Sequence, residues 1–199
     1  MFVKICGLST AEHVQVAVDA GADAVGFVFA ESVREIGPDH ATAISKAVPV
    51  TVKKVAVMRH PSNAMWQHVL SNFSPDVLQT DAEDFDSLDV PAGIEPWPVF
   101  REGNKVTVPL ERGAIPFLYE GARSGAGETV DWASAARVAE RGSMILAGGL
   151  AVDNVAAAIT TVRPFGVDVS SGVESAPGQK DSELIRDFIS AARAAENDL

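Results

Sequence analysis

Short apolar stretches alternate along the whole chain with segments of helical character. The stretches expected to form strands are rich in β-branched and aromatic residues and cover 2–5, 24–29, 52–58, 76–79, 97–100, 116–119, 144–147 and 167–169. The segments expected to form helices cover 10–20, 38–48, 61–73, 82–88, 132–140, 153–162 and 182–195. Nearly continuous apolar strands separated by helices are typical of a parallel sheet that is buried on both faces.

Local signals mark some of the helix ends. Ser9 and Glu12 have the spacing of a capping box. Gly21 follows the first expected helix, where a C-terminal glycine is common, and Asp131 is expected to cap the helix 132–140. The connection 101–115 contains glycine and proline and has no helical period. The fifth helix is therefore expected to be shortened or missing.

Two α/β architectures fit this alternation: a closed barrel and an open, doubly wound sheet. A (β/α)8 barrel needs about 200 residues, which a chain of 199 residues supplies. Open sheets of this length more often carry about five or six strands. The pattern therefore favours a (β/α)8 TIM barrel. Because no linker, low-complexity tract or charge block marks a boundary, we expect a single domain over residues 1–199.

Composition narrows the class of protein further. The net charge is −11 and Lys and Arg form no cluster, which argues against nucleic acids and membrane surfaces as partners. No apolar stretch reaches the roughly 20 residues of a membrane-spanning helix, and the first apolar run is too short for a secretory signal. Cys6 is the single cysteine, so no internal disulfide forms and a reducing cytoplasm is the expected location. Monomer and homodimer both stay open.

Polar residues gather where the expected strands end, which is where both architectures place functional side chains. These positions hold Cys6, Arg34, Gln79, Asp81, Arg101, Glu120 and Asp168. Gly148-Gly149 follows the seventh expected strand, and Ser170-Ser171-Gly172 follows the eighth. In such barrels the loops after these two strands commonly bind phosphate through backbone N–H groups and hydroxyl donors. By itself, Gly148-Gly149 would equally fit a tight turn.

Three of the strand-end residues suit acid–base catalysis or anion binding. Cys6 can act as a base if nearby positive charge lowers the pKa of its thiol from about 8.5, although most free cysteines are small buried side chains. Glu120 follows an apolar strand, where partial desolvation would keep its carboxyl group protonated; a solvated loop glutamate is the alternative. Arg34 suits bidentate binding of a carboxylate, or is an exposed loop arginine.

The histidines give no sign of a metal site. They show no paired spacing with each other or with Cys6, and His60, which follows the third expected strand, has no evident partner. No Ser/His/Asp arrangement is evident, and the dinucleotide-binding motif GxGxxG is absent. We therefore expect neither a metal ion nor a cofactor.

Several motifs occur in order along the chain: Lys4-Ile5-Cys6-Gly7; Gly26-Phe27-Val28-Phe29 with Ser32-Val33-Arg34; Gly125-Ala126-Gly127 with Val130-Asp131-Trp132; Leu146-Ala147-Gly148-Gly149-Leu150 with Asn154-Val155; and 166–174 with Pro177-Gly178 and Lys180-Asp181. In these motifs the chain resembles the phosphoribosylanthranilate isomerase family, the (β/α)8 barrels of tryptophan biosynthesis. The resemblance covers the whole chain, and its first and last motifs together are the most specific.

The resemblance implies an Amadori rearrangement of N-(5-phosphoribosyl)anthranilate. A carboxylic acid protonates the ring oxygen and opens the furanose to a Schiff base, and a cysteine then removes the C2 proton. By this resemblance Cys6 is the base, and Glu120, which lies seven residues before Gly127, is the acid. The resemblance further implies that Arg34 binds the anthranilate carboxylate, that Gln79 and Asp168 contact the substrate, and that Gly148, Gly149, Ser170, Ser171 and Gly172 hold the phosphate.

Two positions depart from the family's pattern. The family's acid is an aspartate; Glu120 carries one more methylene, which moves the carboxyl group by about 1.5 Å and can cost on the order of 100-fold in rate. After the fourth strand the family often has Gln-Leu-His-Gly, where this chain has Gln79-Thr80-Asp81-Ala82. We expect Asp81 to make a polar contact there and assign it no catalytic role.

Two other functions stay open on the sequence alone. The related barrel isomerase of histidine biosynthesis uses two aspartates, one of them at the end of the first strand, where this chain has Cys6. A catalytically silent barrel that binds phosphosugars would keep the loops after the seventh and eighth strands and lose the acid or the base. Glu120 is the feature that favours this second alternative.

Overall fold

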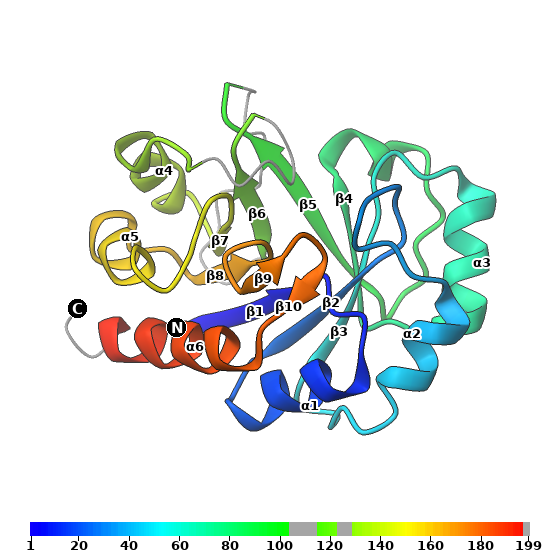
Figure 1. The fold of residues 1–199 in the computed structure, drawn as a ribbon. Coiled ribbons are helices and arrows are strands. Elements are labelled where there is room, and N and C mark those ends of the chain that lie inside the picture. The colour runs from blue at the N-terminus through cyan, green and yellow to red at the C-terminus, as the bar shows by residue number, and fades with distance from the viewer. Residues whose placement is uncertain (104–114, 123–128, 197–199) are drawn as a thin grey trace.

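The strands close a barrel. The computed structural model describes residues 1–103, 115–122 and 129–196, and within them eight strands follow one another around the barrel in chain order (Figure 1). They are β1 (Phe2–Cys6), β2 (Ala24–Val28), β3 (Lys53–Val57), β4 (Val77–Asp81), β5 (Glu95–Arg101), β6 (Phe117–Glu120), β7 (Met144–Leu146) and β8 (Gly166–Val169). Every neighbouring pair is parallel, including β1 with β8. The predicted TIM barrel is confirmed, and the open sheet is wrong.

Helices lie around the outside of the strands (Figure 1). They are α1 (Ala11–Asp19), α2 (Pro38–Ile44), α3 (Asn63–Phe73), the 3-10 helix η1 (Ala82–Asp86), α4 (Trp132–Ala139), α5 (Val155–Val162) and α6 (Ser182–Glu196). A short antiparallel pair, β9 (Glu174–Ala176) and β10 (Gln179–Lys180), lies between β8 and α6.

Some predicted helix bounds are wrong. The second helix ends at Ile44 rather than near residue 48, and turns cover residues 45–47 before Pro49. The segment 82–88 forms only a 3-10 helix, since its aspartates are weak helix formers. The predicted loss of the fifth helix falls on 101–115, of which 104–114 lie outside the described residues.

The helix caps are partly as predicted. Thr10, not Ser9, caps α1: its Oγ1 accepts a hydrogen bond from the backbone N–H of His13 at 3.2 Å. The predicted capping box of Ser9 and Glu12 is therefore wrong: the cap lies one residue later, and the third residue after it is His13 rather than a glutamate. Asp131 caps α4 as predicted, because its carboxylate accepts from two backbone N–H groups in the first turn.

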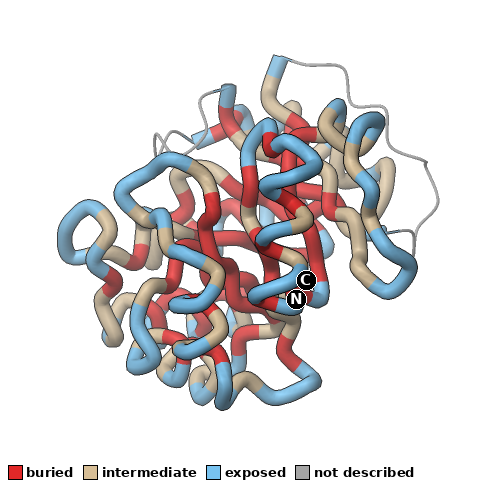
Figure 2. Tube along the Cα trace, turned by 90° about the vertical axis from the view of Figure 1, so that its right-hand side faces the viewer, coloured by how far each residue is buried: buried red, intermediate tan, exposed pale blue. Residues whose placement is uncertain are grey.

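Alternation along the strands separates two apolar layers. Outward-facing residues pack against the helices and form the larger core. Inward-facing residues fill the barrel itself; among them are Val55, Val77, Trp97, Leu118 and Ile145. Figure 2 shows the buried parts of the chain at the centre and the exposed loops around them. The barrel interior is therefore packed rather than open.

The same alternation makes the inward positions polar near the C-terminal ends of the strands. On these strands every second residue shares the face of the interior cluster. The inward-facing polar residues are Lys4, Cys6, Gln79, Asp81, Arg101, Glu120 and Asp168. The barrel thus collects at one end the strand-end residues singled out in the sequence, with Lys4 in addition.

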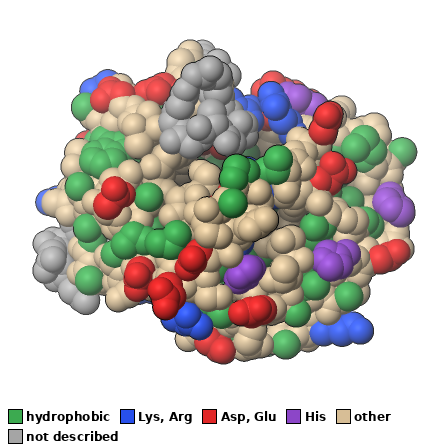
Figure 3. All heavy atoms as spheres, in the orientation of Figure 1, with side chains coloured by type: hydrophobic (Ala, Val, Ile, Leu, Met, Phe, Trp, Pro, Cys, Tyr) green, Lys and Arg blue, Asp and Glu red, His purple; other side chains and the backbone are tan. Residues whose placement is uncertain are grey.

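The surface carries mixed charges. On the face drawn in Figure 3, Lys and Arg side chains lie apart from one another among acidic and apolar ones. This face therefore lacks the basic stripe that is typical of nucleic-acid binding. In the part of the chain that the structure describes, no helix combines the length and the apolar character needed to cross a membrane.

Candidate active site

Cys6 ends β1 inside the barrel, two residues after Lys4. Lys4 is fully buried and Cys6 is 7% exposed. Gly26 is the partner of Cys6 in the register of β1 and β2. A Cβ atom at Gly26 would lie 3.1 Å from Cys6 Sγ and 3.2 Å from Lys4 Nζ. The missing side chain at Gly26 therefore makes room for the sulfur and the ammonium group together.

Lys4 is paired inside the barrel. Its Nζ donates a hydrogen bond to Oδ1 of Asp168 at 2.8 Å, and the two residues are partners in the register of β1 and β8. Burial alone would lower the pKa of Lys4, but attraction to Asp168 and Cys6 outweighs it and raises the pKa above its ordinary value. Lys4 is therefore an ammonium ion.

The protonation of Cys6 is set by opposing influences. Burial raises the pKa of the Cys6 thiol, Lys4 and Lys180 lower it, and Asp168 raises it. Burial is the largest of these, so the pKa lies above its ordinary value. The resting side chain is accordingly a thiol, and the two lysines supply the positive potential that a thiolate requires.

A second charged group joins the loop after β2 to the loop after β8. Arg34 Nε and Nη2 donate to the two carboxylate oxygens of Glu174 at 2.6 and 2.9 Å. Lys180 Nζ donates to Glu174 Oε1 at 2.7 Å and to the backbone oxygen of Ser170 at 2.8 Å. Arg34 is therefore anchored at a largely buried position, and the alternative of an exposed loop arginine is wrong.

Glu174 holds the charges of this group together. Burial alone would raise its pKa, but hydrogen bonds from Arg34 and Lys180 outweigh burial and bring the pKa of Glu174 to about 2. The hydrogen bond to Glu174 also raises the pKa of Arg34. The carboxylate is thus ionised at any physiological pH and fixes the direction of the guanidinium.

Arg34 and Ser170 flank the turn that follows Cys6. Gly7 has a φ of +76°, a conformation that favours glycine. A Cβ atom at Gly7 would lie 2.7 Å from Arg34 Cδ and 3.1 Å from Ser170 Oγ. The end of β1, the arginine and the serine loop are therefore immediate neighbours.

The loop after β7 is shaped by glycine and asparagine. Gly148 and Gly149 have φ values of +89° and +62°. Asn154 Nδ2 donates to the backbone oxygen of Gly149, and its Oδ1 accepts from the backbone N–H of Ala151, both at 2.9 Å. Asn154 therefore ties the glycine pair to the start of α5.

The loop after β8 lies directly against the loop after β7. Gly172 forms a parallel bridge with Ala151. A Cβ atom at Gly172 would lie 1.9 Å from the backbone oxygen of Leu150, so only glycine allows this approach. Ser171, just before it, is exposed. The structure thus brings the two predicted phosphate loops together.

Glu120 ends β6 and lies beside a guanidinium. Its partner in the register of β5 and β6 is Arg101, whose Nη2 is 3.1 Å from Glu120 Oε1. Arg101 Nη1 is hydrogen-bonded to Oδ1 of Asp81, which is 2% exposed at the end of β4. Asp81 therefore makes the polar contact expected of it. A positive charge therefore lies beside the carboxyl group of Glu120.

Gln79 lies two residues before Asp81 and faces the same way. It is 6% exposed, and among the described residues its Oε1 has no hydrogen-bond partner. A buried acceptor of this kind is usually satisfied by a ligand or an ordered water. Gln79 is thus placed to receive a hydrogen bond from a bound molecule.

His60 has partners that its place in the sequence did not reveal. Its Nδ1 lies 3.0 Å from Asp84 Oδ1 and its Nε2 3.4 Å from Asp81 Oδ2, because η1 folds back against the loop after β3. One ligand atom of each residue lies within 4.8 Å of the others, a spacing that could hold a metal ion. Asp81 Oδ1 also accepts from Arg101 and Asp84 Oδ2 from Thr80, so these two carboxylates are already partly engaged by protein groups.

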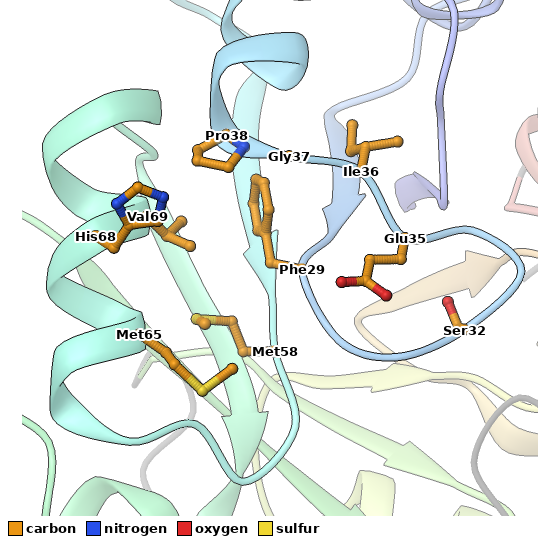
Figure 4. A pocket seen from close by; sticks show the side chains of 10 residues that line it. All are labelled: Phe29, Ser32, Glu35, Ile36, Gly37, Pro38, Met58, Met65, His68 and Val69. Carbon is orange, nitrogen blue, oxygen red and sulfur yellow. The ribbon is translucent and has the colours of Figure 1, made fainter.

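A pocket outside the barrel mouth lies between the segment after β2 and α3 (Figure 4). Phe29 and Glu35 line it from the first of these elements, and Met65 and His68 from the second. The residues that line it include none of the predicted catalytic or binding residues. The strand-end cluster is therefore a separate site.

Sequence reasoning missed the charged residues that support the predicted ones. Lys4 had a usable signal, because it precedes Cys6 by two positions in a strand and must share its face. Glu174 and Lys180 lie in a recognised motif, but their partner Arg34 is 140 positions from Glu174, and no local pattern reveals such a contact.

The fold and these side chains define a (β/α)8 barrel whose site is built at the C-terminal ends of the strands, with loops after β7 and β8 of the kind that bind phosphate in such barrels. Residues 3–191 match the family model described as N-(5'phosphoribosyl)anthranilate (PRA) isomerase. The chain belongs to this family, and the alternative family of histidine biosynthesis is not supported.

Individual relatives agree with the family model. The chain is 40% identical over 190 residues to the N-(5'-phosphoribosyl)anthranilate isomerase of Streptococcus pneumoniae, covering 94% of this chain and 93% of that protein. The crystal structure of TrpF from Jonesia denitrificans is 35% identical, with a TM-score of 0.81 over 98% of each chain. A phosphoribosyl anthranilate isomerase solved in complex with reduced 1-(o-carboxyphenylamino)-1-deoxyribulose 5-phosphate is 30% identical, with a TM-score of 0.79 over 98% of this chain and 99% of that one.

Proposed function

We propose that this protein converts N-(5'-phosphoribosyl)anthranilate to 1-(2-carboxyphenylamino)-1-deoxyribulose 5-phosphate, the Amadori rearrangement of tryptophan biosynthesis. The family match and the relative solved with a reduced form of this product support the substrate. The observation that carries the proposal is the position of Cys6 and Glu120. Each is the last residue of a barrel strand and faces inward, at the same end of the barrel as the loops after β7 and β8. The reaction opens the sugar ring and moves protons within one molecule, with no net oxidation or reduction, so an acid and a base can carry it without a cofactor.

Glu120 is the proposed general acid. Its protonated carboxyl group gives a proton to the ring oxygen while the bond from C1 to that oxygen breaks, and the nitrogen lone pair forms the Schiff base. The guanidinium of Arg101, 3.1 Å away, stabilises the carboxylate that this step leaves behind.

Cys6 is the proposed general base. Its thiolate removes the C2 proton of the ring-opened Schiff base, which gives an enol. The enol then gains a proton at C1 and loses the proton of its C2 hydroxyl, which yields the aminoketose. Burial raises the pKa of the thiol, and Lys4 and Lys180 offset part of that effect. Formation of the reactive thiolate therefore depends on these two ammonium groups.

The remaining predicted residues are proposed to hold the two anionic ends of the substrate and the sugar between them. Because Arg34 uses Nε and Nη2 for Glu174, its Nη1 is the donor proposed for the anthranilate carboxylate. Gln79 and Asp168 are proposed to contact the opened sugar. The proposed phosphate site comprises Gly148, Gly149, Ser170, Ser171 and Gly172.

We further propose that residues 1–199 act as one domain in the cytoplasm, as a monomer or a homodimer, without nucleic acid or membrane as a partner. Light scattering after size-exclusion chromatography distinguishes the monomer, of 20.9 kDa, from the dimer.

The decisive assay is the decay of substrate fluorescence when the protein is added. Cys6→Ser and Glu120→Gln are each expected to lose on the order of 100-fold or more in kcat. A catalytically silent barrel would bind the product analogue and cause no decay, which would reject the isomerase. If Glu120→Gln turns over at the parent rate, Glu120 is not the acid.

A further inference from the structure

Three charged side chains form a row across β4, β5 and β6 at the mouth of the barrel. Arg101 stands between Asp81 and Glu120, with Nη1 on Asp81 Oδ1 and Nη2 3.1 Å from Glu120 Oε1. Arg101 and Glu120 are register partners, and Asp81 ends the strand on the other side of β5. We propose that Arg101 is a positioning residue that sets the direction of the Glu120 carboxyl group, and that Asp81 anchors Arg101 for this purpose.

Burial explains why the anchor is firm. Asp81 is 2% exposed, and a carboxylate at such a position requires a compensating charge and hydrogen bonds. A guanidinium is planar and offers donors in a fixed fork, so holding one edge on Asp81 determines where the other edge points. The carboxyl group of Glu120 therefore lies in an ion pair with a charge that is itself held in place.

His60 lies next to Asp81 on the side away from Arg101. The second carboxylate oxygen of Asp81 lies 3.4 Å from His60 Nε2, and His60 Nδ1 lies 3.0 Å from Asp84. Thr80 donates to Asp84 at 2.5 Å. Asp81 thus has a neighbour on each side, and its hydrogen bond to Arg101 holds one of its two carboxylate oxygens.

By the resemblance described above, Asp81 and Glu120 are the two residues of this row at which the chain departs from the family's pattern. Glutamate carries its carboxyl group about 1.5 Å further out than aspartate, a displacement that would by itself cost on the order of 100-fold in rate. A guanidinium held by Asp81 restrains the longer side chain of Glu120, so Asp81 compensates for the extra methylene of Glu120. This inference rests on Glu120 being the acid.

Steady-state kinetics of Arg101 variants test the role. Arg101→Met is expected to lower kcat by about 30- to 100-fold while KM changes by less than about twofold, because the acid is misdirected and substrate contacts remain. Arg101→Lys keeps a positive charge that reaches one carboxylate at a time, so it should recover part of the loss. A rise in KM at unchanged kcat would overturn the proposal.

A double-mutant cycle separates positioning from a general structural effect. If Arg101 acts through Glu120, Arg101→Met should change kcat by less than about twofold in the Glu120→Gln background. If Glu120→Gln is too slow to measure, the effect of Arg101→Met on kcat is measured in Glu120→Asp instead, because the shorter side chain is expected to lose its contact with Arg101. A full, unchanged loss in both backgrounds would show that Arg101 acts independently of the acid.

Separate controls distinguish a failure of folding from a failure of the proposed function. Arg101→Met leaves Asp81 buried without its partner, so Asp81→Asn with Arg101→Met, which removes both charges, is the variant used if the single change unfolds. Lys53→Met is the matched control, because it removes an ion pair with Glu95 at the opposite end of the barrel. An inactive parent protein would reject the proposed function; an active parent with an inactive Glu120→Gln and a fully active Arg101→Met would reject only the positioning role.

Discussion

Lys4 and Asp168 form an ion pair inside the barrel, with Lys4 Nζ 2.8 Å from Asp168 Oδ1 and no exposure of the Lys4 side chain. The next inward position on β1 is Cys6. An ammonium ion stays charged at such a depth only with a compensating partner. The pair therefore keeps a positive charge beside the sulfur of the proposed base, in a barrel interior that would otherwise favour the neutral thiol.

Replacing Lys4 is predicted to change the pH dependence of catalysis. Lys4 is the strongest of the influences that lower the pKa of Cys6, so Lys4→Met should raise that pKa further. A base acts in its deprotonated form, and the rise of kcat/KM with pH should therefore move to higher pH. At neutral pH the activity should fall about tenfold for each pKa unit of the change.

The control for this prediction is again Lys53→Met, at the opposite end of the barrel, which should keep the parent profile. Lys4→Met also leaves the Asp168 carboxylate without its partner, at a cost of about 3 kcal/mol or more, so thermal unfolding must show that the variant is folded at the assay temperature. A folded variant with the parent's pH profile would rule out Lys4 as the source of the positive potential.

The Arg34–Glu174–Lys180 group predicts how stability depends on pH. Glu174 has an ordinary pKa near 4.5 and a pKa of about 2 in the folded protein. Its stabilisation is therefore complete above pH 4.5 and is lost as the pH falls towards 2. Glu174→Gln should be less stable than the parent by about 3 kcal/mol near neutrality, and the two proteins should converge in acid.

Urea unfolding of the parent and of Glu174→Gln over a series of pH values measures this difference. Glu31→Gln, which changes an exposed glutamate in the loop after β2, should leave stability within about 0.5 kcal/mol of the parent at every pH. A difference between parent and Glu174→Gln that stays constant down to the acid limit would contradict the depressed pKa of Glu174.

Much of the fold follows from local pattern. The apolar strands and the helices between them predict the eight-fold alternation, and Cys6, Glu120 and Asp168 could be placed at one end because parallel strands in a barrel end together. Helix ends were less predictable, since Ser9 and Thr10 are both good caps and their residue types do not decide which of the two begins the helix.

The contacts between strand ends could not be predicted in the same way. Arg101 meets Glu120 because of the register of β5 and β6, and register depends on the connecting loops and on packing rather than on either strand's own sequence. Lys4 and Asp168 are 164 positions apart. Alternation predicts that each faces inward, but only the closure of β1 against β8 makes them partners.

Variants of two glycines, one at each end of the β8 region, can distinguish an effect on phosphate binding from an effect on stability. A Cβ atom at Gly172 would lie 1.9 Å from the backbone oxygen of Leu150, so Gly172→Ala should push the loops after β7 and β8 apart. A Cβ atom at Gly166, at the start of β8 and the opposite end of the barrel, would lie 2.7 Å from the backbone oxygen of Phe2. Both changes force backbone to move and should lower the unfolding temperature.

Only Gly172→Ala is expected to weaken the grip on phosphate. Its KM for the substrate should rise by about tenfold or more, because a displaced loop weakens phosphate binding and a loss of about 1.4 kcal/mol in binding free energy corresponds to a factor of ten. Inhibition by inorganic phosphate should weaken in parallel. Gly166→Ala should keep the parent's KM at temperatures where it is folded. If the two variants raise KM equally, or if Gly172→Ala binds phosphate as the parent does, the phosphate does not lie between these loops.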